Sequence, residues 1–282
     1  MFWSNREIWA FVRIFIRTSK WAIWARRLGS LALPLTLLPV LLHRARLIES
    51  PAFFGVALVA AAVSALAILV ALVALVRLWQ RGDQGWGRAL MGLFLGLCCL
   101  APFAWYGALA LHYPVVTDIA TTSRDALPLV FEPDTAAMPP PRLATEAERE
   151  RFFPNVATRT YPLGAGQLFA LVDNLVAARG WDVRLRREPD GLGGAGRLNA
   201  RILTLPGWRE EAVFRVAPLG EDATVDMRSA SLNAVTDFGS NGERISAFLV
   251  ALDNEVTAFL RDNPNIDQPL DADAPEPVET GN

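Results

Sequence analysis

The chain has 282 residues, 52% of them hydrophobic, and a formal net charge of −2. That small total conceals a division, because residues 1–112 carry eleven basic and three acidic side chains while residues 113–282 carry sixteen and twenty-six. An apolar, basic first part and an acidic second part predict a membrane region followed by a separate domain. Nucleic acid is excluded as an expected partner of the acidic part, since nucleic-acid binding requires clustered positive charge.

Several kinds of chemistry are excluded by residue types that the second part lacks. Residues 113–282 contain neither histidine nor cysteine. A Ser-His-Asp or Cys-His nucleophile within one chain is therefore excluded, as is a zinc ion held by His or Cys. No GxGxxG sequence follows a predicted strand and no GxxxxGK[ST] sequence occurs, so neither a cofactor nor a metal is predicted. The two cysteines, Cys98 and Cys99, lie in an apolar run and are interpreted as packing residues.

Residues 1–27 form the first predicted element, an amphipathic N-terminal segment. At about 100° per residue, Arg6, Arg13, Arg17 and Lys20 fall within an arc of about 60°. Such a basic stripe suits a helix that lies on the inner leaflet, beside anionic headgroups. The alternative, which the surrounding aromatic residues leave open, is that this segment only extends the first membrane span.

Three membrane-spanning helices are predicted within residues 28–112, at about 28–48, 51–76 and 89–111. The second and third contain uncharged stretches long enough to cross a hydrocarbon core of about 30 Å. The first is the weakest, because its uncharged stretch, Leu28–Leu42, is only fifteen residues long and contains Pro34 and Pro39. If it does not cross, two spans remain and the second part of the chain would lie in the cytoplasm.

The arginines set the expected orientation. Basic residues concentrate in the N-terminal segment and in the connection between the second and third spans, which holds Arg77, Arg81 and Arg88. Both segments are expected to face the cytoplasm, and three spans then place everything after His112 outside. The sequence thus predicts a multi-pass protein of the bacterial inner membrane, with the lipid bilayer as a partner and an extracytoplasmic domain. Two arginines in the short external loop disagree with this orientation, Arg44 and Arg46.

The remaining residues divide into three predicted parts. Residues 113–160 are rich in Pro, Thr, Asp and Ala and predict an extended tether, with a short helix at "TEAERERF". Residues 161–262 have the length and apolar periodicity of a compact domain. Residues 263–282 are acidic and proline-rich, which predicts a disordered tail.

The domain at 161–262 is expected to be an α+β two-layer unit of helix, four-stranded antiparallel sheet and helix. "AGQLFALVDNLVAARG" has helical periodicity, and "WDVRLRR", "GRLNARILTL", "EAVFRVAP" and "ATVDMRSASL" alternate as strands. Short connections favour both helices on one face of the sheet. Arg201, Arg215 and Arg228 would then line the uncovered face as solvated side chains or pair with acids. The predicted fold class is therefore an α-helical membrane anchor plus this two-layer domain.

The stretch "VDMRSASLNAVTDFGSNGERISAFLVAL", residues 225–252, passes from a strand through a polar loop into a helix. Ser240 and Glu243 have the spacing of a capping box, and Thr236, Asp237 and Gly239 suit the turn before it. A purely structural role therefore explains this loop. A binding role for the same residues remains open.

The same stretch is similar to a known family, the bacterial and plastid proteins grouped as domain of unknown function 1499. "PVVTDIATTSRDALPLVF" resembles the segment that follows the last span in that family, and "FPNVATRTYP" continues the similarity. Family members read close to "VDVRSxSRxGxSDLGxNxxRIxxFL", against which this chain departs at Asn233, Ala234 and Thr236. The resemblance covers roughly residues 114–262 and implies an architecture and candidate residues but no activity.

These observations favour a non-enzymatic binding or interaction module on a membrane anchor, whose partner is an envelope protein or a lipid-like ligand. No catalytic residue is assigned. The surface would comprise the open sheet face and the loop, with Arg228 and Arg244 as anchors. The rival hypothesis is a membrane-tethered hydrolase or lyase that uses Asp226 or Asp237 as a general base, and a small transporter is the weakest alternative. The candidate binding residues are Arg228, Ser229, Ser231, Asp237, Gly239, Asn241 and Arg244.

Overall fold

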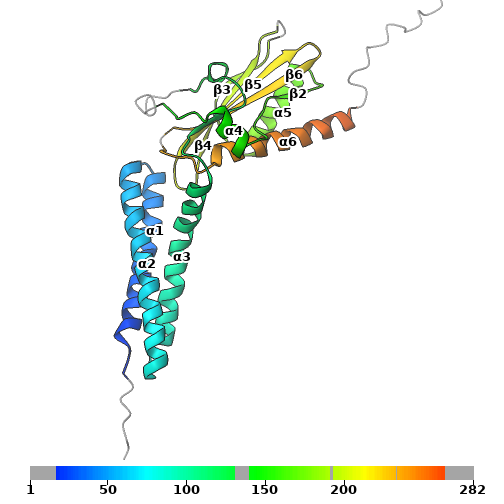
Figure 1. Ribbon diagram of the computed structural model, residues 1–282. Coiled ribbons are helices and arrows are strands. Elements are labelled where there is room, and N and C mark those ends of the chain that lie inside the picture. Colours follow the sequence, from blue (N-terminus) through cyan, green and yellow to red (C-terminus); the bar gives the residue numbers. More distant parts are fainter. Residues whose placement is uncertain (1–16, 131–139, 191–192, 233, 264–282) are drawn as a thin grey trace, which may run out of the picture. The chain divides into compact units, whose positions relative to one another are not determined.

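The computed structural model describes residues 17–130, 140–190, 193–232 and 234–263. The chain separates into two compact units (Figure 1). One comprises Met1–Ala108 with Leu205–Gly207, and the other Leu109–Thr204 with Trp208–Asn282. The predicted acidic tail lies outside the described residues, apart from Asn263.

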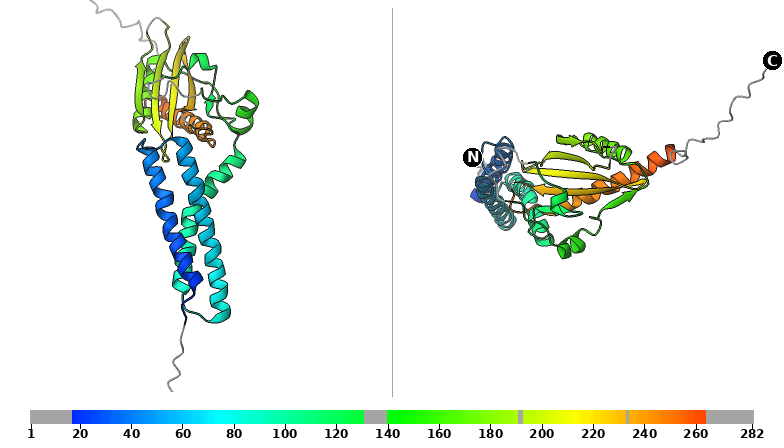
Figure 2. Two further views of the ribbon diagram at one scale, coloured as in Figure 1. Left: turned by 90° about the vertical axis from the view of Figure 1, so that its left-hand side faces the viewer. Right: turned by 90° about the horizontal axis from the view of Figure 1, so that it is seen from above.

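Three helices make up the first unit and run side by side (Figure 2): α1 (Lys20–Arg44), α2 (Ser50–Arg81) and α3 (Trp86–His112). Each is long and apolar enough to cross a membrane, which confirms the predicted helical anchor. Helix α1 begins at Lys20 rather than near residue 28, so residues 20–27 extend the first predicted span. Residues 1–16 of the predicted amphipathic segment lie outside the described part.

Small residues allow α3 to approach both of its neighbours closely. A Cβ atom at Gly92 would lie 2.4 Å from the backbone of Ala25 in α1, and one at Gly96 would lie 2.9 Å from the side chain of Ile68 in α2. Gly92 and Gly96 are one helical turn apart, and small residues at this spacing let membrane helices pack through their backbones. The close approach of α3 to α1 also fixes the position of Arg88, one turn before Gly92.

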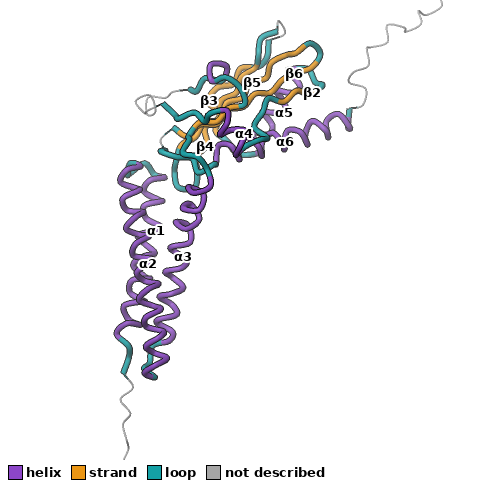
Figure 3. Tube along the Cα trace, viewed as in Figure 1, coloured by secondary structure: helices purple, strands orange, loops and turns teal. Residues whose placement is uncertain are grey.

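The second unit contains a six-stranded antiparallel sheet of order β1-β6-β5-β4-β3, with β2 also paired to β6 (Figure 3). Its elements, in chain order, are β1 (Asp118–Ala120), η1 (Arg124–Ala126), α4 (Glu146–Phe152), β2 (Arg159–Tyr161), α5 (Ala165–Ala178), β3 (Asp182–Arg187), β4 (Gly196–Leu203), β5 (Arg209–Leu219), β6 (Asp222–Ser231) and α6 (Ser240–Asp262). The antiparallel sheet with helices confirms the predicted fold class.

The main core lies between one face of the sheet and helices α5 and α6. Alternate strand residues such as Leu198, Phe214 and Met227 are fully buried there, against Val172 of α5 and Phe248 of α6. The period of two along the strands meets the helical period of α5 and α6, so a single apolar layer forms. This is the layer that the sequence pattern predicts.

The expectation of an extended tether at 113–160 is wrong. Strand β1 lies within this range, β2 begins in it and ends at Tyr161, and each pairs with β6. They raise the number of strands in the described residues from the expected four to six. Each is only three residues long, too short to show an alternating pattern, and the neighbouring β6 supplies their backbone partners. The short helix expected in this range is present as α4.

The second face of the sheet is not uncovered, contrary to expectation. The segment after β1 returns across it and packs Leu127 and Leu129 against Val213 and Ala230, which form a second, smaller core. Because residues 121–130 lack a regular pattern, the sequence gives no sign of this cover. Strand residues expected in solvent are buried beneath it.

Candidate functional site

The candidate residues divide between the two faces of the sheet. Ser229 and Ser231 lie on the helix-covered face with Met227, whereas Arg228 points to the opposite face. Strand alternation makes this division unavoidable, because neighbouring side chains point in opposite directions. The expectation of a single binding surface anchored by both Arg228 and Arg244 is therefore wrong.

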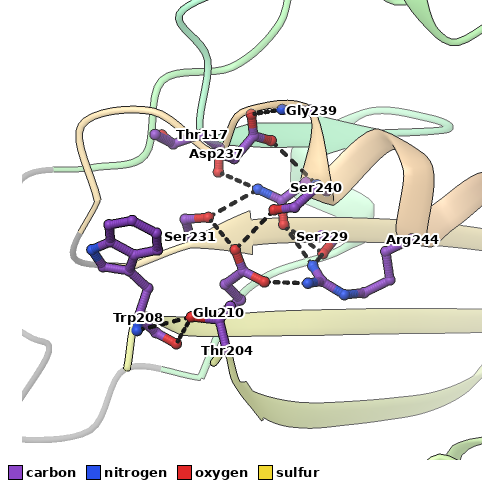
Figure 4. Close-up of polar contacts among 11 residues, drawn as sticks. Thr117, Thr204, Trp208, Glu210, Ser229, Ser231, Asp237, Gly239, Ser240 and Arg244 are labelled. Carbon is purple, nitrogen blue, oxygen red and sulfur yellow. Dashed lines mark hydrogen bonds and ion pairs between the residues drawn. The ribbon is translucent and has the colours of Figure 1, made fainter. Parts of the chain in front are cut away.

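On the helix side, Glu210 of β5 is the centre of a buried group of polar side chains (Figure 4). Its Oε2 forms an ion pair with Arg244 of α6, and its Oε1 accepts hydrogen bonds from Ser231 Oγ at 2.9 Å and Ser240 Oγ at 3.1 Å. Both carboxylate oxygens are thus in use, as a buried charge requires. We call this group the α6 polar cluster; its members are Glu210, Ser229, Ser231, Ser240, Asn241 and Arg244.

Asn241 connects the remaining members. Its Nδ2 donates to Ser231 Oγ at 3.0 Å and to the backbone oxygen of Thr117 at 3.2 Å, and its Oδ1 accepts from Ser229 Oγ at 2.8 Å. Arg244 Nη1 donates to the same Asn241 oxygen and to Ser229 Oγ. The α6 polar cluster therefore fastens the first turn of α6 to strands β5 and β6 and to the chain entering β1. Buried networks of this kind specify one packing arrangement when every member is satisfied.

Asp237 caps α6, in place of the capping box expected from Ser240 and Glu243. The N-cap residue is Gly239, and Asp237 accepts hydrogen bonds from the amides of Gly239 at 2.9 Å and Asn241 at 3.3 Å. Glu243 instead accepts from the hydroxyl of Tyr113. Burial raises the pKa of Asp237 to about 6, against the lowering effect of the two amides. This carboxylate therefore has a structural task.

Two glycines let aromatic rings cover the start of α6. Gly239 has φ of 82°, and a Cβ there would lie 2.6 Å from the ring of Tyr113. A Cβ at Gly242 would lie 2.4 Å from the ring of Phe153. The two rings stack with their centroids 5.4 Å apart. Gly239 is thus needed for both backbone conformation and space, and Gly242 for space alone.

On the opposite face, Arg228 is only 4% exposed and forms a bidentate ion pair with Asp118 of β1. Nε and Nη2 donate to the two carboxylate oxygens at 2.9 and 2.7 Å, and Nη1 donates to the backbone oxygen of Leu127 at 2.8 Å. This pair joins β6, β1 and residues 121–130, which cover this face of the sheet and which we call the covering segment. The expectation that Arg228 lines a solvated face is wrong.

A second buried carboxylate, that of Glu211 on β5, lies near Arg228. Glu211 is fully buried and accepts from the backbone amide of Val130 and from Asn199 Nδ2, both at 2.7 Å, with Arg201 3.8 Å away. Burial raises the pKa of Glu211 above its usual value, and these donors and the nearby arginines oppose the shift. Arg201, also expected in solvent, is 7% exposed. Of the three arginines expected on this face, only Arg215 is substantially exposed, at 40%, with Asp226 3.7 Å away.

The covering segment and Arg228 border an open hollow of about 420 Å³. Its lining residues are Arg124, Asp125, Pro128, Leu129 and Arg228. Arg228 forms its fixed floor. Arg124 lies at its edge, 37% exposed, with Nε 3.3 Å from Asp118 Oδ2. In the part of the chain that the structure describes, this is the one polar contact of the Arg124 side chain. Its two terminal nitrogens can therefore bind an external group.

The two carboxylates considered as general bases are both occupied. Asp226 is 4% exposed and accepts from Thr158 Oγ1 at 2.6 Å and Thr121 Oγ1 at 3.3 Å. Asp237 is 5% exposed and serves as the cap described above. Neither arrangement leaves a carboxylate directed at a substrate. Within the described residues, no group of three or more His, Cys, Asp or Glu side chains could hold a metal ion.

Comparison with protein families finds a match within the α+β unit. Residues 134–252 match the DUF1499 family, whose description is a protein of unknown function. This confirms the resemblance noted in the sequence. The matched range holds β2 to β6 and most of α6, but it begins after β1, η1 and the hollow at Arg124. No curated protein matches the chain.

Sequence reasoning missed several residues on which the site depends. Asp118 and Arg124 lie in the segment expected to be a tether, and Glu210 stands at the start of a strand, where an acid suggests solvent. For these three residues we find no such signal. A signal did exist for the close packing at the start of α6, because Gly242 precedes a strongly amphipathic run and no turn there requires a glycine. A glycine in a helical pattern often marks a close contact, here with Phe153.

Proposed function

We propose that this chain presents a non-enzymatic binding module on the extracytoplasmic face of a bacterial inner membrane, and that the module binds an anionic group in the hollow at Arg124. The helical anchor and the family match are compatible with this proposal. The partner that we propose is a small envelope ligand with a phosphate or carboxylate next to an aliphatic portion.

The orientation rests on the distribution of charge. Arg77, Arg81 and Arg88 lie at or between the facing ends of α2 and α3, and Lys20, Arg26 and Arg27 lie in the first turns of α1. Basic residues are retained on the cytoplasmic side of a membrane. Three spanning helices then carry the acidic α+β unit to the other side.

The observation that carries the ligand proposal is the chemistry of the hollow. Arg124 has unused donors, and a guanidinium binds phosphate or carboxylate through paired hydrogen bonds. Pro128 and Leu129 supply an apolar wall beside it. Asp125, exposed at the same hollow, opposes an anion, so its charge limits the affinity. The ion pair between Arg228 and Asp118 holds the floor in place without ligand.

Binding by a soluble probe tests this proposal. Hexyl phosphate, titrated by calorimetry against the full chain in neutral detergent, should show saturable binding. Arg124→Gln should weaken binding on the order of tenfold, the value of one charge-assisted hydrogen bond. Asp125→Asn should strengthen it by a few-fold, because a like charge is removed.

Arg215→Gln is the matched control. Arg215 points to the same sheet face, has nearly the same exposure as Arg124 and is also beside one carboxylate. Its replacement should leave the affinity for hexyl phosphate unchanged. Equal losses for Arg124→Gln and Arg215→Gln would remove the hollow from the proposal.

Accessibility to a membrane-impermeant thiol reagent tests the orientation. After replacement of Cys98 and Cys99, a cysteine at Glu255 should react from outside intact spheroplasts and one at Gln84 should not. Both positions are exposed in their own units. The reverse pattern would place the α+β unit in the cytoplasm.

A further inference from the structure

The basic end of the helical unit contains a hollow of about 360 Å³ between α1 and α3. It is lined by Ile23, Arg26, Arg27, Ser30 and Arg88. Three of these five side chains are arginines, and none is acidic. The hollow lies in the anchor, so it is separate from the one at Arg124.

Helix packing explains why these arginines are close together. The contact of Gly92 with the backbone of Ala25 and Arg26 draws α3 against α1 at this level. Arg88, one turn before Gly92, is therefore held beside Arg26. The two positive charges repel each other because they line the same hollow. An anion that binds between them offsets this repulsion.

The protein itself does not supply that anion within the described residues. The side chains of Arg26 and Arg88 have no hydrogen bond or ion pair there, and the Arg27 side chain lies over the ring of Trp24, 5.6 Å from its centre. The acidic residue at this end, Asp83, lines a different hollow with Arg77 and Arg81. The three guanidinium groups are thus available to a ligand from outside.

We propose that Arg26, Arg88 and Arg27 bind the phosphate of one anionic phospholipid, with Ser30 as an additional hydroxyl donor and the acyl chains along the apolar part of α1 that follows. Both the basic residues and the apolar helix below them suit a headgroup at the membrane surface. Free phosphate shares the same chemistry, so the source of the phosphate must be separated by experiment.

Native mass spectrometry of the full chain in neutral detergent provides the test. Added phosphatidylglycerol should be retained as one bound lipid per chain, and phosphatidylcholine should not compete with it. Arg26→Gln and Arg88→Gln should each weaken retention on the order of tenfold. Inorganic phosphate at millimolar concentration should displace little of the lipid, because it lacks the acyl contacts. Displacement by inorganic phosphate alone would identify a phosphate site rather than a lipid site and overturn the proposal.

One control separates the site from general attraction to charge. Arg46→Gln removes one positive charge beyond the other end of α1 and should leave lipid retention unchanged. A loss of retention in the Arg46 variant equal to that in the Arg26 variant would overturn the proposal. Because Arg26 and Arg88 are exposed, their replacement should leave the melting temperature without lipid unchanged, which excludes misfolding.

Discussion

The buried arginines of the α+β unit and the exposed arginines at the basic end of the helical unit have opposite roles. In the α+β unit, Arg228, Arg244 and Arg201 are buried or nearly so, and each lies beside a carboxylate from another strand or helix. At the basic end of the helical unit, Arg26 and Arg88 are exposed and have no such partner within the described residues. Arginines of the first kind hold elements together, whereas those of the second kind are available to bind anions.

The same comparison explains why the most distinctive stretch of the sequence is a poor guide to ligand binding. Residues 225–252 contain all seven candidate binding residues, yet the structure places them in polar networks that the protein satisfies by itself. Arg124, which lies outside that stretch, retains unused donors. A conspicuous polar motif can therefore reflect the requirements of packing and not those of ligand binding.

The largest expected effect is the loss of the ion pair between Arg228 and Asp118. Arg228→Ala leaves Asp118 fully buried without its bidentate partner, and breaking a buried pair in this way costs about 3–5 kcal/mol of unfolding free energy. Denaturant unfolding of the full chain in detergent measures this cost. Arg215→Ala, which removes an exposed arginine from the same face, should cost less than about 1 kcal/mol. Similar small losses in both variants would contradict a structural role for Arg228.

The next effect depends on pH and on Asp237. Its pKa in the folded state is about 6, above its usual 3.8, so the folded state binds the proton more readily. This group therefore adds stability as the pH falls from about 7 to about 4, by at most about 3 kcal/mol. Asp237→Asn removes that contribution, so the stability of the native chain relative to the variant should rise as the pH falls. A difference independent of pH would contradict the raised pKa.

A smaller effect is expected from the glycine beneath Phe153. Gly242→Ala places a methyl group where the Phe153 ring lies, and such overpacking costs about 1–3 kcal/mol. Gly166→Ala in α5 is the control, since a Cβ there meets no atom within 4 Å. It should leave the melting temperature unchanged or raise it slightly. If Gly242→Ala also raised the melting temperature, the packing of Phe153 against α6 would be wrong.

The smallest effect on stability concerns the helical unit. Arg26→Gln in neutral detergent without anionic lipid should change the unfolding free energy by less than about 0.5 kcal/mol, because an exposed side chain without a partner is removed. Thermal unfolding followed by tryptophan fluorescence measures it. A loss comparable to that of Arg228→Ala would erase the distinction between the two kinds of arginine.

Regular patterns made the larger elements predictable from sequence. Long uncharged runs predicted α2 and α3, and alternation around Leu198, Phe214 and Met227 predicted the central strands and their core. Lys20, Arg26 and Arg27 obscured the start of α1, because charged residues at a membrane surface can continue a helix beyond its apolar part. Elements with a regular hydrophobic pattern could therefore be predicted from the sequence.

The remaining features depend on partners far away in the chain. Strand β1 is stabilised by pairing with β6, more than a hundred residues later, and nothing in "TDIAT" alone predicts a strand. Asp118 likewise becomes important only when Arg228 lies beside it. Capping also misled the sequence interpretation, since Ser240 and Glu243 had suitable spacing but were bound to Glu210 and Tyr113. Local spacing cannot show which of two available partners a side chain will choose.

The most direct measurement is the melting temperature of the full chain and its arginine variants in neutral detergent, with and without phosphatidylglycerol. We expect Arg228→Gln and Arg244→Gln to melt at lower temperature in both conditions while retaining the rise that the lipid produces. Arg26→Gln and Arg88→Gln should melt like the native chain without lipid and lose most of that rise. If the two pairs of variants instead responded alike to lipid, the division between structural and ligand-binding arginines would be contradicted.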